Sequence, residues 1–179
     1  MAGEVLLENK LSYQNVLVTS EEKLVYLLAE VRPATGTGTG GSAPLNLAIV
    51  LDKSGSMYAA RKLDYVKEAV KYVIDQLRPN DICAIIAFAD KARVLIPAGQ
   101  LYDKLQAKRM IDNIDQVDVG SGTEMLKGIQ ASVDQVQRNF SPDRMNHILL
   151  LTDGLTQHEA RCRDKCAEGN GLGISFSTF

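Results

Sequence analysis

The strongest constraint on the fold is an alternation of apolar runs and helical patterns after residue 44. Residues 45–51, 82–88 and 148–151 are predominantly apolar, as expected for strands that are buried on both faces of a sheet. Between these runs, apolar residues recur every three or four positions, which is the spacing of one face of a helix. Strands that alternate with helices favour a mostly parallel sheet with helices on both faces, so we predict an α/β fold.

The predicted helices cover residues 63–77, 103–117, 126–140 and 157–167. Pro79 follows the first helix and stops it. The last helix is expected to end at the glycine-rich break at 168–173, before a final strand at 174–179. Residues 93–96 follow the strand at 82–88 too closely for a helical crossover, so they predict one antiparallel strand at the sheet edge.

The first 44 residues differ from the rest of the chain in composition. Residues 5–18 and 23–31 are rich in β-forming side chains and are separated by a polar turn, which predicts a strand pair. Residues 34–44 are rich in glycine, but they lead into a strand, whereas a phosphate-binding glycine loop opens a helix. We therefore predict an N-terminal β-strand extension over residues 1–33, a linker or hairpin loop over 34–44, and an α/β domain over 45–179.

The overall charge and hydropathy argue against several classes of partner. The chain has 179 residues and a formal net charge of -2, which gives no reason to expect a nucleic acid or an anionic membrane as a partner. No stretch approaches the roughly 18 apolar residues of a membrane span, and the N-terminus lacks the basic and apolar segments of a signal peptide. We therefore expect no nucleic-acid partner and no membrane insertion.

The three cysteines do not describe a disulfide framework, because their number is odd, and this favours a reducing, cytoplasmic compartment. Cys83 lies in an apolar run and is expected in the core. His158, Cys162 and Cys166 are spaced four residues apart along one face of a predicted helix. Eight residues of helix rise about 12 Å, whereas zinc ligands lie about 2.0–2.3 Å from the ion. The three residues therefore cannot all bind one ion. Either two of them form part of a metal site, or all three belong to a half-buried helix face.

Oxygen-bearing side chains follow or precede the predicted elements at three separate places. They are Asp52, Ser54 and Ser56 after the first apolar run, Ser121 and Thr123 before the third helix, and Asp153 after the last apolar run. Ligands of such sheets bind beyond the carboxyl ends of the strands, so we expect these groups to lie together. Carboxylates and hydroxyls without His or Cys suit Mg²⁺ better than zinc or copper.

Each of these three segments also has a structural interpretation. Ser56 can cap the helix that follows it, Ser121 and Glu124 have the spacing of a capping box, and Asp153 opens an ordinary turn. The conjunction of all three segments is what indicates a metal site.

The set Asp52, Ser54, Ser56, Thr123 and Asp153 resembles the metal-ion-dependent adhesion site of the von Willebrand factor A domain. The resemblance runs from about residue 45 to residue 179, and the N-terminal strand pair is similar to bacterial members of that family. It implies a doubly wound, Rossmann-like domain. It also implies that Ser54 and Ser56 bind a metal directly, that Thr123 binds directly or through water, and that Asp52 and Asp153 act through waters and hydrogen bonds.

The resemblance further implies a protein partner that supplies a carboxylate to the metal. Neutral hydroxyl ligands leave much of the ion's charge uncompensated, so an Asp or Glu of the partner can complete the coordination. The positive end of a helix beginning near Met57 would add to this attraction. Mg²⁺ is the expected ion, with Mn²⁺ or Ca²⁺ as alternatives. Candidates for the surrounding contact surface are Met57, Tyr58, Asp90, Glu124 and Gln157.

Two other functions remain open from the sequence. One is a Mg²⁺-dependent phosphoryl-transfer or phosphatase-like enzyme in which Asp52 is the nucleophile. Such a site needs a further acid or base, but the positions beside Asp52 hold serines, and His147 precedes a strand at the wrong end of the sheet. The other is a scaffold with a vestigial metal site. We expect no enzymatic activity.

The C-terminal strand carries one further expectation. A full domain of the resembled family continues with another helix and strand after residue 179, so the edge formed by residues 174–179 would expose unpaired backbone groups. We therefore expect self-association through this edge, by edge pairing or by exchange of elements between copies.

Overall fold

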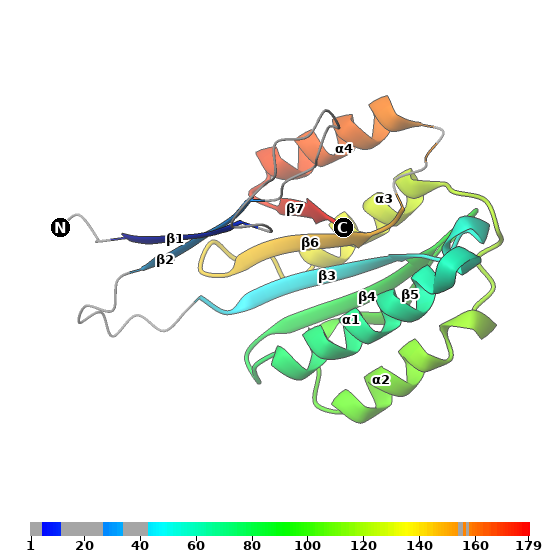
Figure 1. Ribbon diagram of the computed structural model, residues 1–179, viewed down its shortest axis with the longest axis horizontal. Helices are drawn as coiled ribbons and strands as arrows, with labels where there is room; N and C mark the ends of the chain where they lie inside the picture. Colours follow the sequence, from blue (N-terminus) through cyan, green and yellow to red (C-terminus); the bar gives the residue numbers. More distant parts are fainter. Residues whose placement is uncertain (1–4, 12–26, 34–42, 154–155, 157) are drawn as a thin grey trace, which may run out of the picture. The chain divides into compact units, whose positions relative to one another are not determined.

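The computed structural model describes residues 5–11, 27–33, 43–153, 156 and 158–179 (Figure 1). The chain divides into two compact units, Met1–Gly41 and Ser42–Phe179. In the first unit, β1 (Val5–Leu11) pairs antiparallel with β2 (Leu27–Pro33). The expected N-terminal strand pair is therefore confirmed, with shorter strands. The turn expected between them and most of the glycine-rich linker lie outside the described residues.

The second unit contains a five-stranded sheet in the order β5-β4-β3-β6-β7. Its strands are β3 (Leu45–Asp52), β4 (Ile82–Phe88), β5 (Ala92–Gln100), β6 (Met145–Leu151) and β7 (Ser175–Thr178). All neighbouring pairs are parallel except β4 and β5, which are antiparallel. The predicted α/β class with one antiparallel edge strand is confirmed. Within the described part of the chain, β7 pairs only with β6, and self-association through its other edge stays a prediction.

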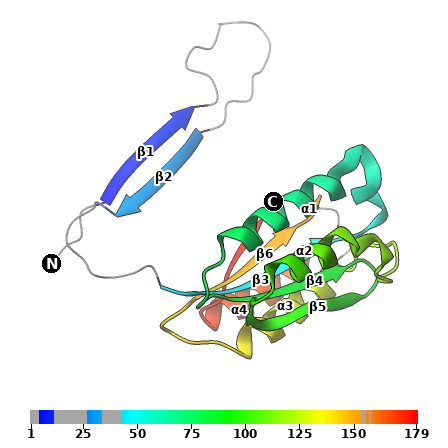
Figure 2. The same cartoon turned by 90° about the horizontal axis from the view of Figure 1, so that it is seen from below.

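Helices cover both faces of this sheet (Figure 2). They are the 3₁₀ helix η1 (Gly55–Arg61), α1 (Lys62–Gln76), α2 (Lys104–Asp112), the 3₁₀ turn η2 (Ile114–Gln116), α3 (Met125–Gln137) and α4 (Glu159–Gly171). On β3, Leu47 and Ile49 pack in the core cluster that includes α1 and α2, whereas Ala48 and Val50 pack in the cluster that includes α3 and α4. This two-sided burial explains why β3 reads as an almost continuous apolar run. No helix among the described residues has the length and hydropathy needed to cross a membrane.

Several helix boundaries differ from the sequence prediction, including the C-terminal ends of α2 at Asp112 and of α3 at Gln137, which were expected at residues 117 and 140. The helix expected near Met57 begins at Lys62, because Ala60 and Arg61 have positive φ angles of 51° and 58° and separate α1 from η1. The glycine-rich break at 168–173 does not end α4 where expected, since the helix continues to Gly171. Gly169 allows this continuation, because a Cβ there would lie 2.7 Å from the Phe176 ring.

Gly128 in α3 provides a test of close packing between helix and sheet. A Cβ on this residue would lie 2.8 Å from Phe88 Cδ1 and 3.1 Å from Val50 Cγ1. Overpacking lowers the free energy of unfolding by about 1–3 kcal/mol. The better helix propensity of alanine offsets about 1 kcal/mol of this loss. We therefore expect Gly128→Ala to lower the free energy of unfolding by about 1 kcal/mol in urea denaturation. Gly171→Ala is the matched control, since its Cβ meets no atom within 4 Å; an equal loss in both variants would contradict the packing argument.

Candidate metal centre

The candidate site begins where β3 ends, at the carboxyl edge of the parallel strands. Asp52 is the last residue of β3 and is fully buried. It lies opposite Phe88, the last residue of β4, and the preceding Leu51 lies opposite Leu151, the last residue of β6. Three strand ends therefore meet around Asp52, as expected for the ligand-binding edge of such a sheet.

The carboxylate of Asp52 organises the turn that follows it. Its Oδ1 accepts a hydrogen bond of 2.7 Å from the backbone N–H of Ser54, and its Oδ2 accepts one of 2.7 Å from Thr152 Oγ1. The first bond fixes the backbone that presents Ser54, and the second connects the turn to the end of β6. Asp52 therefore has a positioning role that the sequence pattern alone did not reveal.

The hydroxyls of Ser54 and Ser56 lie next to each other. Their Oγ atoms share a hydrogen bond of 3.1 Å, in which either hydroxyl can donate, and Ser54 is buried while Ser56 is half-buried. Ligands at neighbouring vertices of an octahedron with bonds of about 2.1 Å are about 3.0 Å apart, which is the geometry that Mg²⁺ requires. The two serines therefore fit two adjacent ligands of one small divalent cation.

The loop that carries Thr123 is held against the ends of β3 and β4. Gly55 N donates to Ser121 O at 3.0 Å, and Glu124 N donates to Ala89 O at 2.8 Å. These bonds bring the backbone next to Thr123 to the turn of Ser54 and Ser56. The segments of four expected metal residues, Asp52, Ser54, Ser56 and Thr123, are thus brought together by hydrogen bonds.

Asp90 shapes this loop through its side chain. Its Oδ2 accepts a hydrogen bond of 2.9 Å from Ser121 N. Hydrogen bonds from the backbone of Ser121 and then of Gly122 hold the pKa of Asp90 below its ordinary value. Gly120 and Gly122 lack the Cβ atoms that would lie 2.1 Å from its carboxylate oxygens. Asp90 is exposed, and its predicted role in partner contact stays a prediction beside this role in the loop.

Asp153 follows β6 at the same edge of the sheet and forms an ion pair. Lys62 Nζ, from the first residue of α1, lies 3.0 Å from Asp153 Oδ2. The side chain of Asp153 is 10% exposed and that of Lys62 is 44% exposed. Lys62 was not predicted as a site residue, because a basic residue at the start of a helix gives no local signal of such a long-range contact.

Three other predicted contact residues lie in the described part of the chain, and they differ in exposure and contacts. Met57 is 2% exposed and packs in the core, so the prediction that it contributes to a contact surface is wrong. Tyr58 is 52% exposed, and Lys53 Nζ lies 5.8 Å from the centre of its ring. Glu124 is half-buried, with Oε1 3.7 Å from His158 Nε2. Gln157 lies outside the described residues.

The two capping alternatives for these segments are not supported, and the turn expected after Asp153 lies outside the described residues. Helix α1 has Arg61 at its N-cap, so Ser56 does not cap it. Helix α3 has Glu124 at its N-cap without a side-chain hydrogen bond, so the capping box expected from Ser121 and Glu124 is not formed. One expected attraction for a partner's carboxylate is also absent near Met57. The positive N-terminal end of α1 lies at Lys62 instead.

The burial of the cysteines fits a structural role better than a metal site. Burial raises the pKa of the Cys83 thiol to about 12, as expected for a core residue. Cys162 is buried and Cys166 is half-buried, which favours the helix-face interpretation. Among the described residues, no group of three or more His, Cys, Asp or Glu side chains could hold a metal ion. A cation at the Asp52 edge would therefore depend on hydroxyl ligands.

The chain is similar in sequence to proteins of one family. The sequence profile of the von Willebrand factor type A domain matches residues 47–155. An uncharacterized protein of Synechocystis sp. is 34% identical over 115 residues, which are 64% of this chain and 26% of that protein. The matched region thus spans about a quarter of the relative's length.

Solved structures share the fold. The conserved hypothetical protein BatB of Bacteroides thetaiotaomicron has a TM-score of 0.63 at 25% identity, covering 75% of this chain and 65% of that chain. The manganese-loaded TRAP protein of Plasmodium vivax has a TM-score of 0.65 at 18% identity, covering 76% of this chain and 56% of that chain. The second similarity concerns the fold alone.

Proposed function

The chain belongs to the von Willebrand factor type A domain family, and we propose that it binds a divalent cation and, through it, an acidic side chain of a protein partner. Domains of this family commonly mediate protein–protein interactions, some of them with the help of a metal. The proposed cation site consists of Asp52, Ser54, Ser56, Thr123 and Asp153. The observation that carries the proposal is the 3.1 Å spacing of the Ser54 and Ser56 hydroxyls beside the fully buried Asp52.

Four of these five residues have a separate task in this proposal, and Asp153 is expected to act through waters and hydrogen bonds. Ser54 and Ser56 offer neutral oxygens at neighbouring coordination positions, and Asp52 holds the Ser54 backbone in place. Thr123 approaches from the loop that Asp90 fixes. The cation, when bound, supplies positive charge that a partner's carboxylate can coordinate, and neutral ligands leave most of that charge available. Tyr58, Asp90, Glu124 and Gln157 are the proposed contact residues around it.

The same geometry gives less support to an enzyme. The carboxylate of Asp52 accepts two hydrogen bonds and is fully buried, which disfavours its use as an exposed nucleophile. His147 lies on β6 and its Nδ1 contacts Ser175 Oγ at 2.7 Å, away from the carboxyl end of that strand. We therefore propose a binding module without turnover, with Mg²⁺ as the first ion to test and Mn²⁺ and Ca²⁺ as alternatives.

Calorimetric titration with Mg²⁺ tests the cation site. We expect the wild-type protein to bind one equivalent and Ser54→Ala to lose at least about tenfold in affinity, because a direct ligand is removed. Ser141→Ala is the matched control, since its hydroxyl accepts a hydrogen bond of 3.2 Å from Asp143 N in a distant loop. Equal Mg²⁺ binding by all three proteins would refute the site and favour a scaffold with a vestigial motif.

A retention experiment tests the binding function itself. The immobilised protein should retain a partner in Mg²⁺ and release it in EDTA, and the Ser54→Ala protein should retain none. Hydrolysis of p-nitrophenyl phosphate, dependent on Mg²⁺ and abolished by Asp52→Ala, would instead support the phosphatase-like alternative.

A further inference from the structure

Lys62 lies where it can affect a cation at the proposed site. It is the first residue of α1, directly after the left-handed residues Ala60 and Arg61. Its ammonium group lies 3.0 Å from Asp153 Oδ2, a contact between residues that are 91 positions apart. The side chain thus reaches from the helix start to the end of β6, beside the strand end that carries Asp52.

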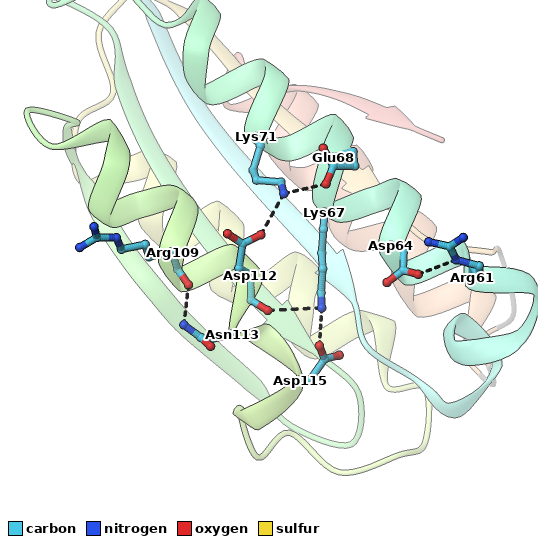
Figure 3. Close-up of polar contacts among 9 residues, drawn as sticks. All are labelled: Arg61, Asp64, Lys67, Glu68, Lys71, Arg109, Asp112, Asn113 and Asp115. Carbon is cyan, nitrogen blue, oxygen red and sulfur yellow. Dashed lines mark hydrogen bonds and ion pairs between the residues drawn. The ribbon is translucent and has the colours of Figure 1, made fainter.

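The lysines Lys67 and Lys71 of α1 pair with other carboxylates (Figure 3). Lys67 pairs with Asp115, and Lys71 pairs with Glu68 at 2.6 Å and with Asp112 at 2.9 Å. The pairs with Asp112 and Asp115 connect α1 to the α2 region. Lys71 follows Lys62 by nine residues, which is about 13.5 Å along a helix. Lys71 therefore offers the same charge on the same helix at a distance from the candidate site.

We infer that Lys62 weakens the affinity of the site for a divalent cation by pairing with Asp153. The inference rests on the proposed function, since it concerns the same site. Of the two carboxylates assigned to that site, Asp153 already has a positive charge beside it. A divalent cation that arrives there meets either the repulsion of this ammonium group or the cost of moving it away.

Both possibilities change the metal affinity in the same direction. If Lys62 stays beside Asp153, its positive charge repels a cation that Asp153 helps to hold. If Lys62 is displaced, its ion pair with Asp153 is lost when the metal binds. Lys62 thus raises the cation concentration that is needed to fill the site.

Mg²⁺ titration of Lys62 variants tests the inference. We expect Lys62→Met to bind Mg²⁺ about fivefold more tightly than the wild type, because one like charge is removed from a partly exposed position. Lys62→Arg keeps the charge and should stay within about twofold of the wild type. Lys71→Met removes a charge of the same sign and should also stay within about twofold, because solvent and salt screen it.

Three outcomes separate this inference from the proposed function. If the wild type binds Mg²⁺ and Lys62→Met binds it equally or more weakly, the inference is overturned and the proposed function stands. An equal gain in Lys71→Met would also overturn it, because the effect would then be one of net charge. If neither the wild type nor Lys62→Met binds Mg²⁺, while both are folded by circular dichroism, the proposed function fails and the inference fails with it.

Discussion

Gly120→Ala is expected to lower the free energy of unfolding by about 2–4 kcal/mol and to weaken Mg²⁺ binding at least about tenfold. Gly120 has a φ of +83°, a conformation that costs a residue with a Cβ about 1–2 kcal/mol. The new Cβ would also lie 2.1 Å from Asp90 Oδ2 and 2.7 Å from Asp90 Cβ. Urea denaturation and Mg²⁺ titration measure the two effects.

The collision with Asp90 explains why binding should suffer together with stability. Asp90 Oδ2 accepts the hydrogen bond from Ser121 N, so it cannot move away without releasing the loop that precedes Thr123. If Asp90 stays in place, the backbone at Gly120 must shift. Either movement alters the approach of Thr123 to the turn of Ser54 and Ser56.

A double mutant separates the two costs of Gly120→Ala. Asp90→Ala removes the colliding carboxylate but leaves the strain of the left-handed backbone and the close approach of 2.7 Å to Cβ of residue 90. Gly120→Ala combined with Asp90→Ala should therefore lose less stability than the sum of the single losses. Gly99→Ala is the control, because its Cβ would lie 3.9 Å from the nearest atom, an ordinary contact. Strictly additive losses would show that the collision does not contribute.

The sequence predicted the sheet well because its signals are local. The strand predicted at 82–88 has the observed bounds of β4, and the antiparallel direction of β5 followed from the short connection before it. The boundaries that failed depend on tertiary contacts. Helix α4 passes through Gly169 because that glycine packs against Phe176, and periodicity carries no information about such a contact.

The sequence predicted which segments form the candidate site, but it did not predict the contacts between them. The motif placed Asp52, Ser54 and Ser56 at a strand end, which the structure confirms. The hydrogen bond from Thr152 to Asp52 and the ion pair of Lys62 with Asp153 join residues 100 and 91 positions apart. Such pairs depend on how strands and helices lie side by side, which a single sequence does not encode locally. Met57 was placed on the surface because the 3₁₀ turn that buries it was not foreseen.

Asp81→Asn is expected to lower the free energy of unfolding by about 2–4 kcal/mol at neutral pH, because a buried carboxylate with several donors is lost. Asp81 is 2% exposed. Its Oδ1 accepts from Leu45 N at 2.8 Å and its Oδ2 accepts from Arg78 N at 2.7 Å, while Arg78 Nη2 forms an ion pair with Oδ1 at 3.1 Å. The amide of asparagine would keep one acceptor and turn an N–H₂ group toward these donors.

The pH dependence of this loss identifies its cause. Burial by itself raises the pKa of Asp81, but the hydrogen bonds from Arg78 and Leu45 outweigh burial and hold the pKa below its ordinary value. Because the folded-state pKa is lowered, the stabilisation is complete above the unfolded pKa of about 3.9 and is lost as the pH falls through the folded value. Urea denaturation should therefore show a large gap between wild type and Asp81→Asn near pH 7, and a gap that shrinks in strong acid. Asp143→Asn, at an exposed position, should show little gap at either pH. A gap for Asp81→Asn that stays constant with pH would mean that the charge of Asp81 does not anchor the start of β3 to the end of α1.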